Sequence, residues 1–144
     1  MRITGLLLVV VVLLQGCSIN QKVTPVAGKG IAELTVIENP AVKNTFLDAL
    51  KKAVEEQGVA VQVGPAAADP EDYPYAMTYT ANWTWDMALY LVYTEINVFE
   101  KGEEIGKAVY DSRRGGARMD KFINAENKVK ELVGELFGSQ PSEQ

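Results

Sequence analysis

Strict alternation of apolar and polar residues over positions 76–85 is the feature that most constrains how this chain can fold. A period of two is typical of a β-strand that buries one face. The apolar positions are Met77, Tyr79, Ala81, Trp83 and Trp85, and the polar positions are Thr78, Thr80, Asn82 and Thr84. Nine of the twelve aromatic residues lie between Tyr73 and Tyr110, so we expect this half of the chain to form most of the sheet.

Two further strands are predicted after this one. Residues 88–100 are apolar on both faces near their start, which is typical of a central strand covered on both sides. Asp86 and Met87 would connect the first two strands. Lys101-Gly102 is a hairpin signal, and residues 105–112 would return as a third antiparallel strand.

The preceding part of the chain predicts a strand, a helix and a second strand. Residues 32–37 alternate as a strand does, and Asn39 and Pro40 suit the N-cap and first position of a helix that ends before Gly58. Residues 59–63 then supply another strand. This order implies a right-handed crossover and two parallel strands.

A loop and a second helix complete the prediction. Residues 64–74 form a Pro-rich loop, and its acidic residues (Asp69, Glu71 and Asp72) are expected to be solvated rather than to bind a cation. Residues 113–122 break the pattern, and Asn124 caps a helix that Gly138 ends. The order β-α-β-β-β-β-α predicts an α+β, two-layer fold: a mixed sheet of about five strands with two amphipathic helices on one face. We expect residues 31–137 to form one globular domain and residues 138–144 a disordered tail.

The N-terminus is typical of a bacterial lipoprotein signal. Arg2 supplies a positive charge and the apolar core that follows has about 12 residues, too few for a membrane-spanning helix, which needs roughly 20. Leu14-Gln15-Gly16-Cys17 resembles a lipobox, and Cys17 is the only Cys in the chain. We predict that residues 1–16 are removed and that Cys17 is acylated, which would anchor the chain to a membrane.

The residues after Cys17 bear on the location of the protein. By resemblance to the sorting rule of enteric lipoproteins, Ser18 favours the periplasmic leaflet of the outer membrane over the inner membrane. Residues 17–30 have no periodicity, and we expect them to be the lipidated Cys followed by a flexible tether.

Two stretches resemble a known family. Residues 78–91 and 108–137, with Trp-x-Trp-Asp at 83–86 and Arg-Gly-Gly-x-Arg at 114–118, are similar to a family of small proteobacterial lipoproteins that has no assigned activity. That resemblance implies the same location and fold but no catalytic residue. The element order is more distantly similar to envelope accessory lipoproteins, such as activators of penicillin-binding proteins and subunits of secretion machines.

The composition excludes several catalytic sites. The chain has no His and one Cys, so its own residues cannot form a Ser-His-Asp triad, a Cys-His pair or a Cys/His zinc site. Asp86 and Asp111 lie at predicted strand ends and would need a separation of about 5–9 Å to act as a glycosidase pair. The net charge of −5 argues against a nucleic-acid partner. We therefore predict no catalytic residue, metal or cofactor, and expect the protein not to be an enzyme.

Two clusters are candidate contact sites. The first is the arginine loop, defined as Arg113, Arg114, Gly115, Gly116 and Arg118. Its glycines could expose backbone N–H groups to an anion or an acidic partner, or its arginines could pair locally with Asp111, Asp120 or Glu126. The second is an aromatic platform for a sugar or peptide, made of Tyr79, Trp83, Trp85 and Tyr90; the alternative is that these rings belong to the core.

These features predict a lipid-anchored, non-enzymatic interaction or accessory module that binds an unidentified envelope protein. The alternative is a small-ligand or glycan-binding lipoprotein that uses the aromatic strands around Trp83 and Trp85. An enclosed apolar pocket at these tryptophans would favour the ligand, whereas a packed aromatic core with a flat exposed patch would favour a protein partner.

Overall fold

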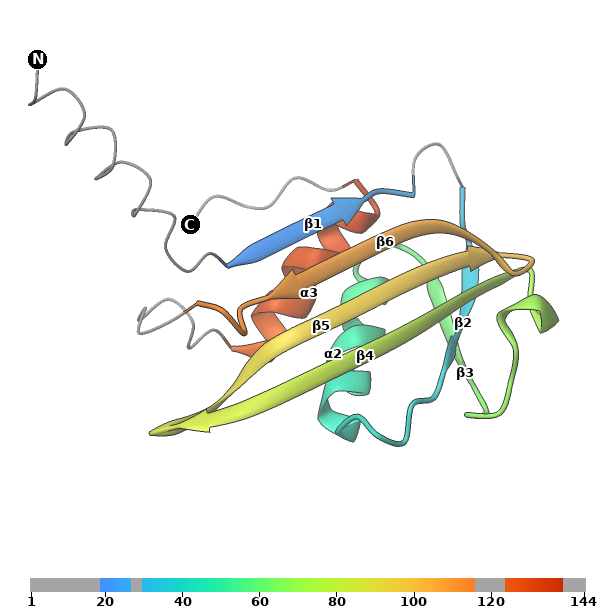
Figure 1. Cartoon of the computed structure of the whole chain (residues 1–144). Coiled ribbons are helices and arrows are strands. Elements are labelled where there is room, and N and C mark those ends of the chain that lie inside the picture. Colours follow the sequence, from blue (N-terminus) through green and yellow to red (C-terminus); the bar gives the residue numbers. More distant parts are fainter. Residues whose placement is uncertain (1–18, 27–29, 116–123, 139–144) are drawn as a thin grey trace, which may run out of the picture.

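A six-stranded mixed sheet carries two helices on one face and leaves the other face open (Figure 1). The computed structural model describes residues 19–26, 30–115 and 124–138. The strands are β1 (Asn20–Thr24), β2 (Glu33–Ile37), β3 (Ala60–Gly64), β4 (Tyr75–Asp86), β5 (Ala88–Glu100) and β6 (Glu103–Asp111). The helices are α2 (Asn44–Glu55) and α3 (Ala125–Leu136), with a short 3₁₀ helix η1 (Pro70–Asp72) before β4. The α+β class and the placement of both helices on one face are as predicted.

The strand order in the sheet is β1-β6-β5-β4-β2-β3. β2 and β3 are parallel, as expected for strands joined through α2, while β4, β5 and β6 pair antiparallel in sequence order. The turn between β5 and β6 has positive φ at both central residues, Lys101 (49°) and Gly102 (85°). This is the backbone that a two-residue type I′ hairpin requires, so the predicted Lys-Gly turn is confirmed.

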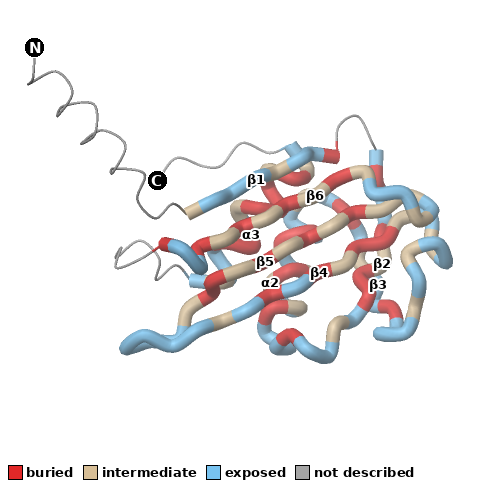
Figure 2. The backbone as a smooth tube through the Cα atoms, in the orientation of Figure 1, coloured by how far each residue is buried: buried red, intermediate tan, exposed pale blue. Residues whose placement is uncertain are grey.

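One face of the sheet and the two helices enclose the core. α2 contributes Phe46, Leu50 and Val54, and α3 contributes Val129, Leu132 and Leu136, all of which are buried. Burial alternates along β4, β5 and β6, and Figure 2 shows that the buried positions end before the outer tip of the β4–β5 hairpin. The two-residue period of the sequence therefore identified the covered face correctly along most of each strand.

The strand β1 was not predicted, because residues 17–30 were expected to form a tether. β1 pairs antiparallel with the edge of β6, so that Asn20 lies opposite Asp111 and Thr24 opposite Lys107. Its one apolar residue, Val23, is only half-buried. Gln21, on the same face of the strand, contacts α3 through hydrogen bonds. A strand held by polar contacts has no apolar period for sequence analysis to detect.

Two local predictions differ from the structure. Asn39 does not cap α2, which begins five residues later; its Oδ1 accepts from Ala41 N–H (3.1 Å) and its amide donates to the Tyr79 carbonyl (2.9 Å), so it caps a turn and ties that turn to β4. β5 is not covered on both faces. The apolar run at its start consists of the exposed hairpin tip and a bulge opposite Asn82 and Trp83, where Val92 is the extra residue.

The boundaries of the C-terminal helix agree with the prediction. The side chain of Asn124 accepts a hydrogen bond from Glu126 N–H (2.8 Å), and Gly138 follows the helix at a φ of 83°. No helix in the described residues is long and apolar enough to cross a membrane.

Candidate functional site

The arginine loop leaves the end of β6 beside the start of β1. Asn20, Asp111, Arg113 and Arg114 line a small polar depression there. Arg113 makes a bidentate ion pair with Asp111, in which Nε donates to Oδ1 (2.9 Å) and a terminal nitrogen donates to Oδ2 (2.6 Å). Gly116 and Arg118 lie outside the described residues. Of the two arginines that the structure describes here, both are exposed, and Arg113 pairs locally with Asp111 as one of the two alternatives expected.

The ion pair at the arginine loop changes the electrostatics of both partners. Hydrogen bonds from Arg113 hold the pKa of Asp111 below its usual value, and the carboxylate in turn raises the pKa of Arg113. The guanidinium also lies over the ring of Tyr93, 4.5 Å from its centroid. Two of the donors of Arg113 and one aromatic face are therefore already engaged within the domain.

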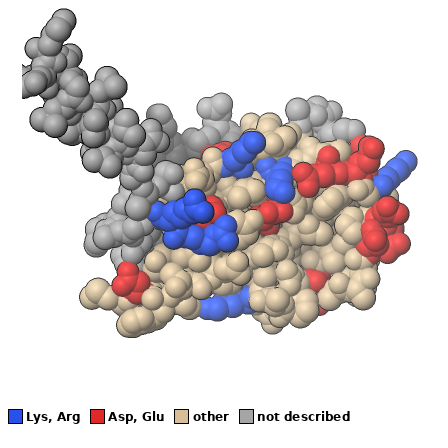
Figure 3. All heavy atoms as spheres, in the orientation of Figure 1, with Lys and Arg blue, Asp and Glu red and all other residues tan. Residues whose placement is uncertain are grey.

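A polar network continues from Tyr93 along the open face of the sheet. The Tyr93 hydroxyl donates to Glu95 Oε2 (2.6 Å), and Lys107 Nζ lies 3.0 Å from Glu95 Oε1. The bond to Glu95 is the main reason that the pKa of Tyr93 is raised to about 12, and the same bond helps to lower the pKa of Glu95. Figure 3 views this face and shows acidic and basic side chains lying close together on it. The open face is thus polar and charge-paired.

The structure does not bring all four residues of the proposed aromatic platform into one surface. Tyr79 is buried and stacks on Phe46 at 5.7 Å, and Trp83 meets the same Phe46 ring edge-on at 5.9 Å. Trp85 is 72% exposed beyond the helices. Tyr90 lies opposite Thr84 in the hairpin, a position of the other face of the strands. Tyr79 belongs to the core and Trp83 packs against it, while Trp83 and Tyr90 both line a second, shallow depression that does not include Trp85.

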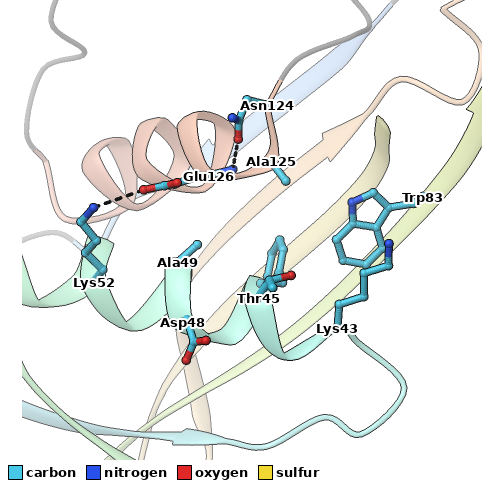
Figure 4. Close-up of a pocket in the computed structure, with 10 residues that line it drawn as sticks. Lys43, Thr45, Asp48, Ala49, Lys52, Trp83, Asn124, Ala125 and Glu126 are labelled. Atoms are coloured by element: carbon cyan, nitrogen blue, oxygen red, sulfur yellow. Dashed lines mark hydrogen bonds and ion pairs between the residues drawn. The ribbon is translucent and has the colours of Figure 1, made fainter. Parts of the chain in front are cut away.

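An open groove lies beside Trp83, between the start of α2, the start of α3 and the hairpin (Figure 4). Its volume is about 430 Å³. Lys43 Nζ lies 4.9 Å from the centroid of the Trp83 ring, so one ring face is already in contact with a cation. An ion pair between Lys52 and Glu126 (3.2 Å) crosses the groove wall from α2 to α3. The groove has a largely apolar lining but is open to solvent, unlike the enclosed pocket that is typical of small-molecule sites.

The tip of the β4–β5 hairpin is a feature that sequence analysis missed. Within the described residues four large apolar side chains are exposed, and three of them lie in this tip: Trp85 (72%), Met87 (89%) and Leu89 (55%). Trp85 and Leu89 are directly opposite each other across the hairpin. Alternation places Trp85 on the same face as Trp83, but it does not show where the cover provided by the helices ends.

The candidate carboxylates do not form a catalytic pair. Asp111 lies in the row of Tyr93, and Asp86 lies beside Ala88, five residues further along β5. Because of the bulge at Val92, these five residues of β5 match four residues of β4, which span roughly 13 Å, still well beyond the separation used by glycosidases. In the predicted acidic loop, Asp69 and Asp72 form a reciprocal capping box at the ends of η1. Among the described residues, no three His, Cys, Asp or Glu side chains are grouped as metal ligands would be.

Comparison with known proteins identifies similar folds. No protein-family model matches the chain, and no curated protein matches its sequence. Two solved structures of the PelC dodecamer from Paraburkholderia phytofirmans are similar to it. The first has a TM-score of 0.57 at 12% identity, and the alignment covers 84% of this chain and 99% of that chain. The second has a TM-score of 0.51 at 10% identity, and the alignment covers 83% of this chain and 95% of that chain. A minor lipoprotein from Acinetobacter baumannii aligns with a TM-score of 0.40 at 15% identity, over 77% of this chain and 98% of that protein. What the two PelC structures share with this chain is the fold.

Proposed function

We propose that the protein is a lipid-anchored envelope lipoprotein that acts as a non-enzymatic interaction module on the periplasmic side of the outer membrane. The observation that carries this proposal is the position of β1. Strand pairing with β6 begins at Asn20, three residues after Cys17, the residue expected to carry the lipid. An acyl group on Cys17 would therefore hold the folded domain against the membrane surface rather than at the end of a tether.

The state of the titratable side chains supports a non-enzymatic role. The carboxylates with lowered pKa, which are Glu95, Asp111 and Glu131, are each engaged in ion pairs or hydrogen bonds with neighbouring side chains. None of the three lines the groove at Trp83. Perturbed groups that face one another across a cleft would instead indicate acid–base chemistry. The chain also has no His.

We propose further that the module associates with copies of itself through the open face of the sheet. The two PelC structures with a similar fold are dodecamers, and the fold alignment covers nearly all of PelC. Between Thr78 and Thr84, the residues of β4 on the open face are all polar, and none of the described helices covers them. A polar face of this kind suits hydrogen-bonded contacts between subunits.

One measurement tests the lipid anchor and a second tests the self-association. For the anchor, the intact mass of the membrane-extracted protein should show loss of residues 1–16 and addition of acyl groups, and a Cys17→Ser variant should leave the membrane fraction. An unmodified Cys17 thiol in the membrane-bound protein would contradict the anchor. For the assembly, Asn82→Lys on the open face should reduce the mass measured in detergent by light scattering, while Asn127→Lys on α3 should not. A wild-type protein that is monomeric would contradict self-association.

The second candidate function is ligand binding in the groove at Trp83, which its volume of about 430 Å³ would permit. The contact between Lys43 and the indole ring disfavours sugar stacking on that ring face. Saturable change of tryptophan fluorescence on titration with envelope oligosaccharides, retained in Trp85→Phe and enhanced in Lys43→Ala, would support this function over the first.

A further inference from the structure

We infer that the tip of the β4–β5 hairpin is a membrane-docking element, in which Trp85, Met87 and Leu89 enter the interfacial layer of the bilayer that holds the lipid anchor. This inference rests on the proposed lipid anchor at Cys17. It adds a second contact with the membrane, made by the folded domain itself, and it defines how the domain is oriented on the bilayer.

The first argument is the direction in which the strands run. Asn20, Asp111 and Tyr93 form one row across β1, β6 and β5. From that row the chain leads back from Asn20 toward Cys17, and the β4–β5 hairpin extends beyond the row at the same end of the sheet (Figure 1). The start of β1, from which an anchor at Cys17 would extend, and the tip therefore lie at one end of the domain.

The second argument is reach. Two residue steps separate Cys17 from Ile19, the first described residue, so their Cα atoms are at most about 7 Å apart. The hairpin tip projects roughly 13 Å beyond the row of Tyr93, which is the length of the four residue steps from Asn82 to Asp86 along β4. A projecting tip and a short anchor can meet the same bilayer surface, because the acyl chains and the tip would both enter it.

The third argument is the chemistry of the tip. Trp85 and Leu89 pair across the hairpin, and Met87 occupies the turn, so three exposed apolar side chains lie within five residues at the tip. Tryptophan is enriched at the level of lipid headgroups, where its ring is apolar and its N–H can reach polar groups. Asp86 also lies in the tip, which limits its depth to the headgroup layer and excludes the hydrocarbon core.

The backbone of the tip supports a functional reason for its sequence. Met87 has a φ of 61°, in the left-handed region that Gly or Asn adopts at lower cost. A large apolar residue with an 89% exposed side chain gains nothing from packing within the domain. Its presence at a strained turn position indicates selection for contact with something outside the domain.

Cationic side chains near this end match the phosphates of a membrane. Arg114 follows the end of β6 and is exposed, and Lys43 lies over Trp83, two residues from Trp85 along β4. In Figure 3 the hairpin tip is mostly uncharged, and basic side chains lie further from the tip, nearer the middle of the sheet. This arrangement, with an apolar tip in front of basic groups, suits a bilayer surface, in which phosphates lie outside the acyl chains.

The test uses the full-length acylated protein reconstituted in phosphatidylcholine vesicles whose acyl chains carry bromine, which quenches tryptophan fluorescence at short range. The chain has two tryptophans, so Trp85→Phe leaves Trp83 as a matched internal control. We expect clear quenching of the wild type, loss of most of that quenching in Trp85→Phe, and retention in Trp83→Phe. Met87→Ser with Leu89→Ser keeps both tryptophans and should reduce the quenching by withdrawing Trp85 from the bilayer.

The outcomes separate this inference from the proposed function. Acylated protein that floats with the vesicles, but whose emission is quenched no more than that of Trp85→Phe, would overturn the docking element and leave the anchor intact. Lack of acylation would overturn both. A detergent-solubilised oligomer that dissociates in the Met87→Ser, Leu89→Ser variant would assign the tip to a contact between copies and overturn the membrane assignment. Since these exposed side chains support no core, circular dichroism of the variants should match the wild type.

Discussion

Gln21 Oε1 accepts a hydrogen bond of 2.9 Å from Nζ of Lys128, which joins the edge strand β1 to helix α3 across the end of the core. Lys128 is 6% exposed; it also bonds to Glu131 (2.8 Å) and lies over the ring of Tyr110. The Gln21 amide donates in turn to Glu131 and Glu135. A buried ammonium with carboxylate, amide and aromatic partners adds to the one apolar contact that β1 makes with the core, through Val23.

We expect Gln21→Ala to loosen β1. The change removes one partner of a buried charge and two bonds to α3, which should lower the free energy of unfolding by about 1–3 kcal/mol. Amide hydrogen exchange within residues 20–24 should accelerate more than exchange in β4 or β5. The control is Gln62→Ala on the opposite edge strand, where the side chain bonds to an exposed Glu33 and little should change. Equal effects of the two variants would contradict the role assigned to Lys128.

The same cluster predicts sensitivity to acid. Burial alone would raise the pKa of Glu131, but hydrogen bonds from Lys128 and Gln21 outweigh it and hold the pKa below its usual value. The folded-state pKa is thus below the unfolded one, so the stabilisation is present above the unfolded pKa and is lost as pH falls through the folded pKa. Denaturant titrations across the acidic range should show a shallower loss for Glu131→Gln than for the wild type.

Core packing provides a prediction that tests the face of α2. Leu50 is fully buried, and Leu50→Ala should lower the free energy of unfolding by about 2–5 kcal/mol. Leu47 lies on the same helix but is only partly buried, so Leu47→Ala is a matched control with a smaller expected cost. Chemical denaturation of the two variants measures the difference. A cost below about 1 kcal/mol for Leu50→Ala would show that the helix face is misplaced.

Much of the fold could be predicted because periodic burial leaves a periodic sequence. The alternation in β4, the Lys101-Gly102 turn and the cap at Asn124 each depend on local chemistry, and each is confirmed. Asn39 shows the limit of such signals. Its side chain does cap a backbone N–H, but the capped element is a turn, because Asn39 also bonds to Tyr79, 40 residues away in the sequence.

The parts that could not be predicted depend on tertiary contacts. β1 is held by a polar network with α3, and neither segment alone indicates the other. The arginine loop was treated as one cluster, yet Arg113 turns back onto Asp111 and Tyr93. Trp83 and Trp85 are equivalent in the sequence pattern, but Phe46 covers only the first of them. What separates the two tryptophans is the position at which α2 begins.

We predict that Tyr93, on the open face of the sheet, loses its proton at a higher pH than an ordinary tyrosine. The hydrogen bond to Glu95 and the negative charge of that carboxylate raise the pKa of Tyr93 to about 12. Glu95→Gln should lower it toward 10, the ordinary value for tyrosine, while Glu103→Gln on β6 should have little effect. Because the folded pKa is the higher one, the associated stabilisation is complete below the unfolded pKa and is lost as pH rises through the folded pKa. Carbon chemical shifts of the Tyr93 ring, followed by NMR, would measure the change.

The two described arginines of the loop should differ in what they do. Hydrogen bonds from Arg113 are the main cause of the lowered pKa of Asp111, and Arg114 contributes only a weaker charge interaction. Arg113→Gln should therefore return the pKa of Asp111 to its ordinary range, and Arg114→Gln should raise it slightly. Carboxyl NMR titration of both variants measures these shifts, and equal shifts would contradict the structure.

If the loop also contacts membrane phosphates, Arg114→Gln should weaken vesicle binding of a Cys17→Ser protein more at low salt than at high salt, because salt screens exposed charges over about 8 Å.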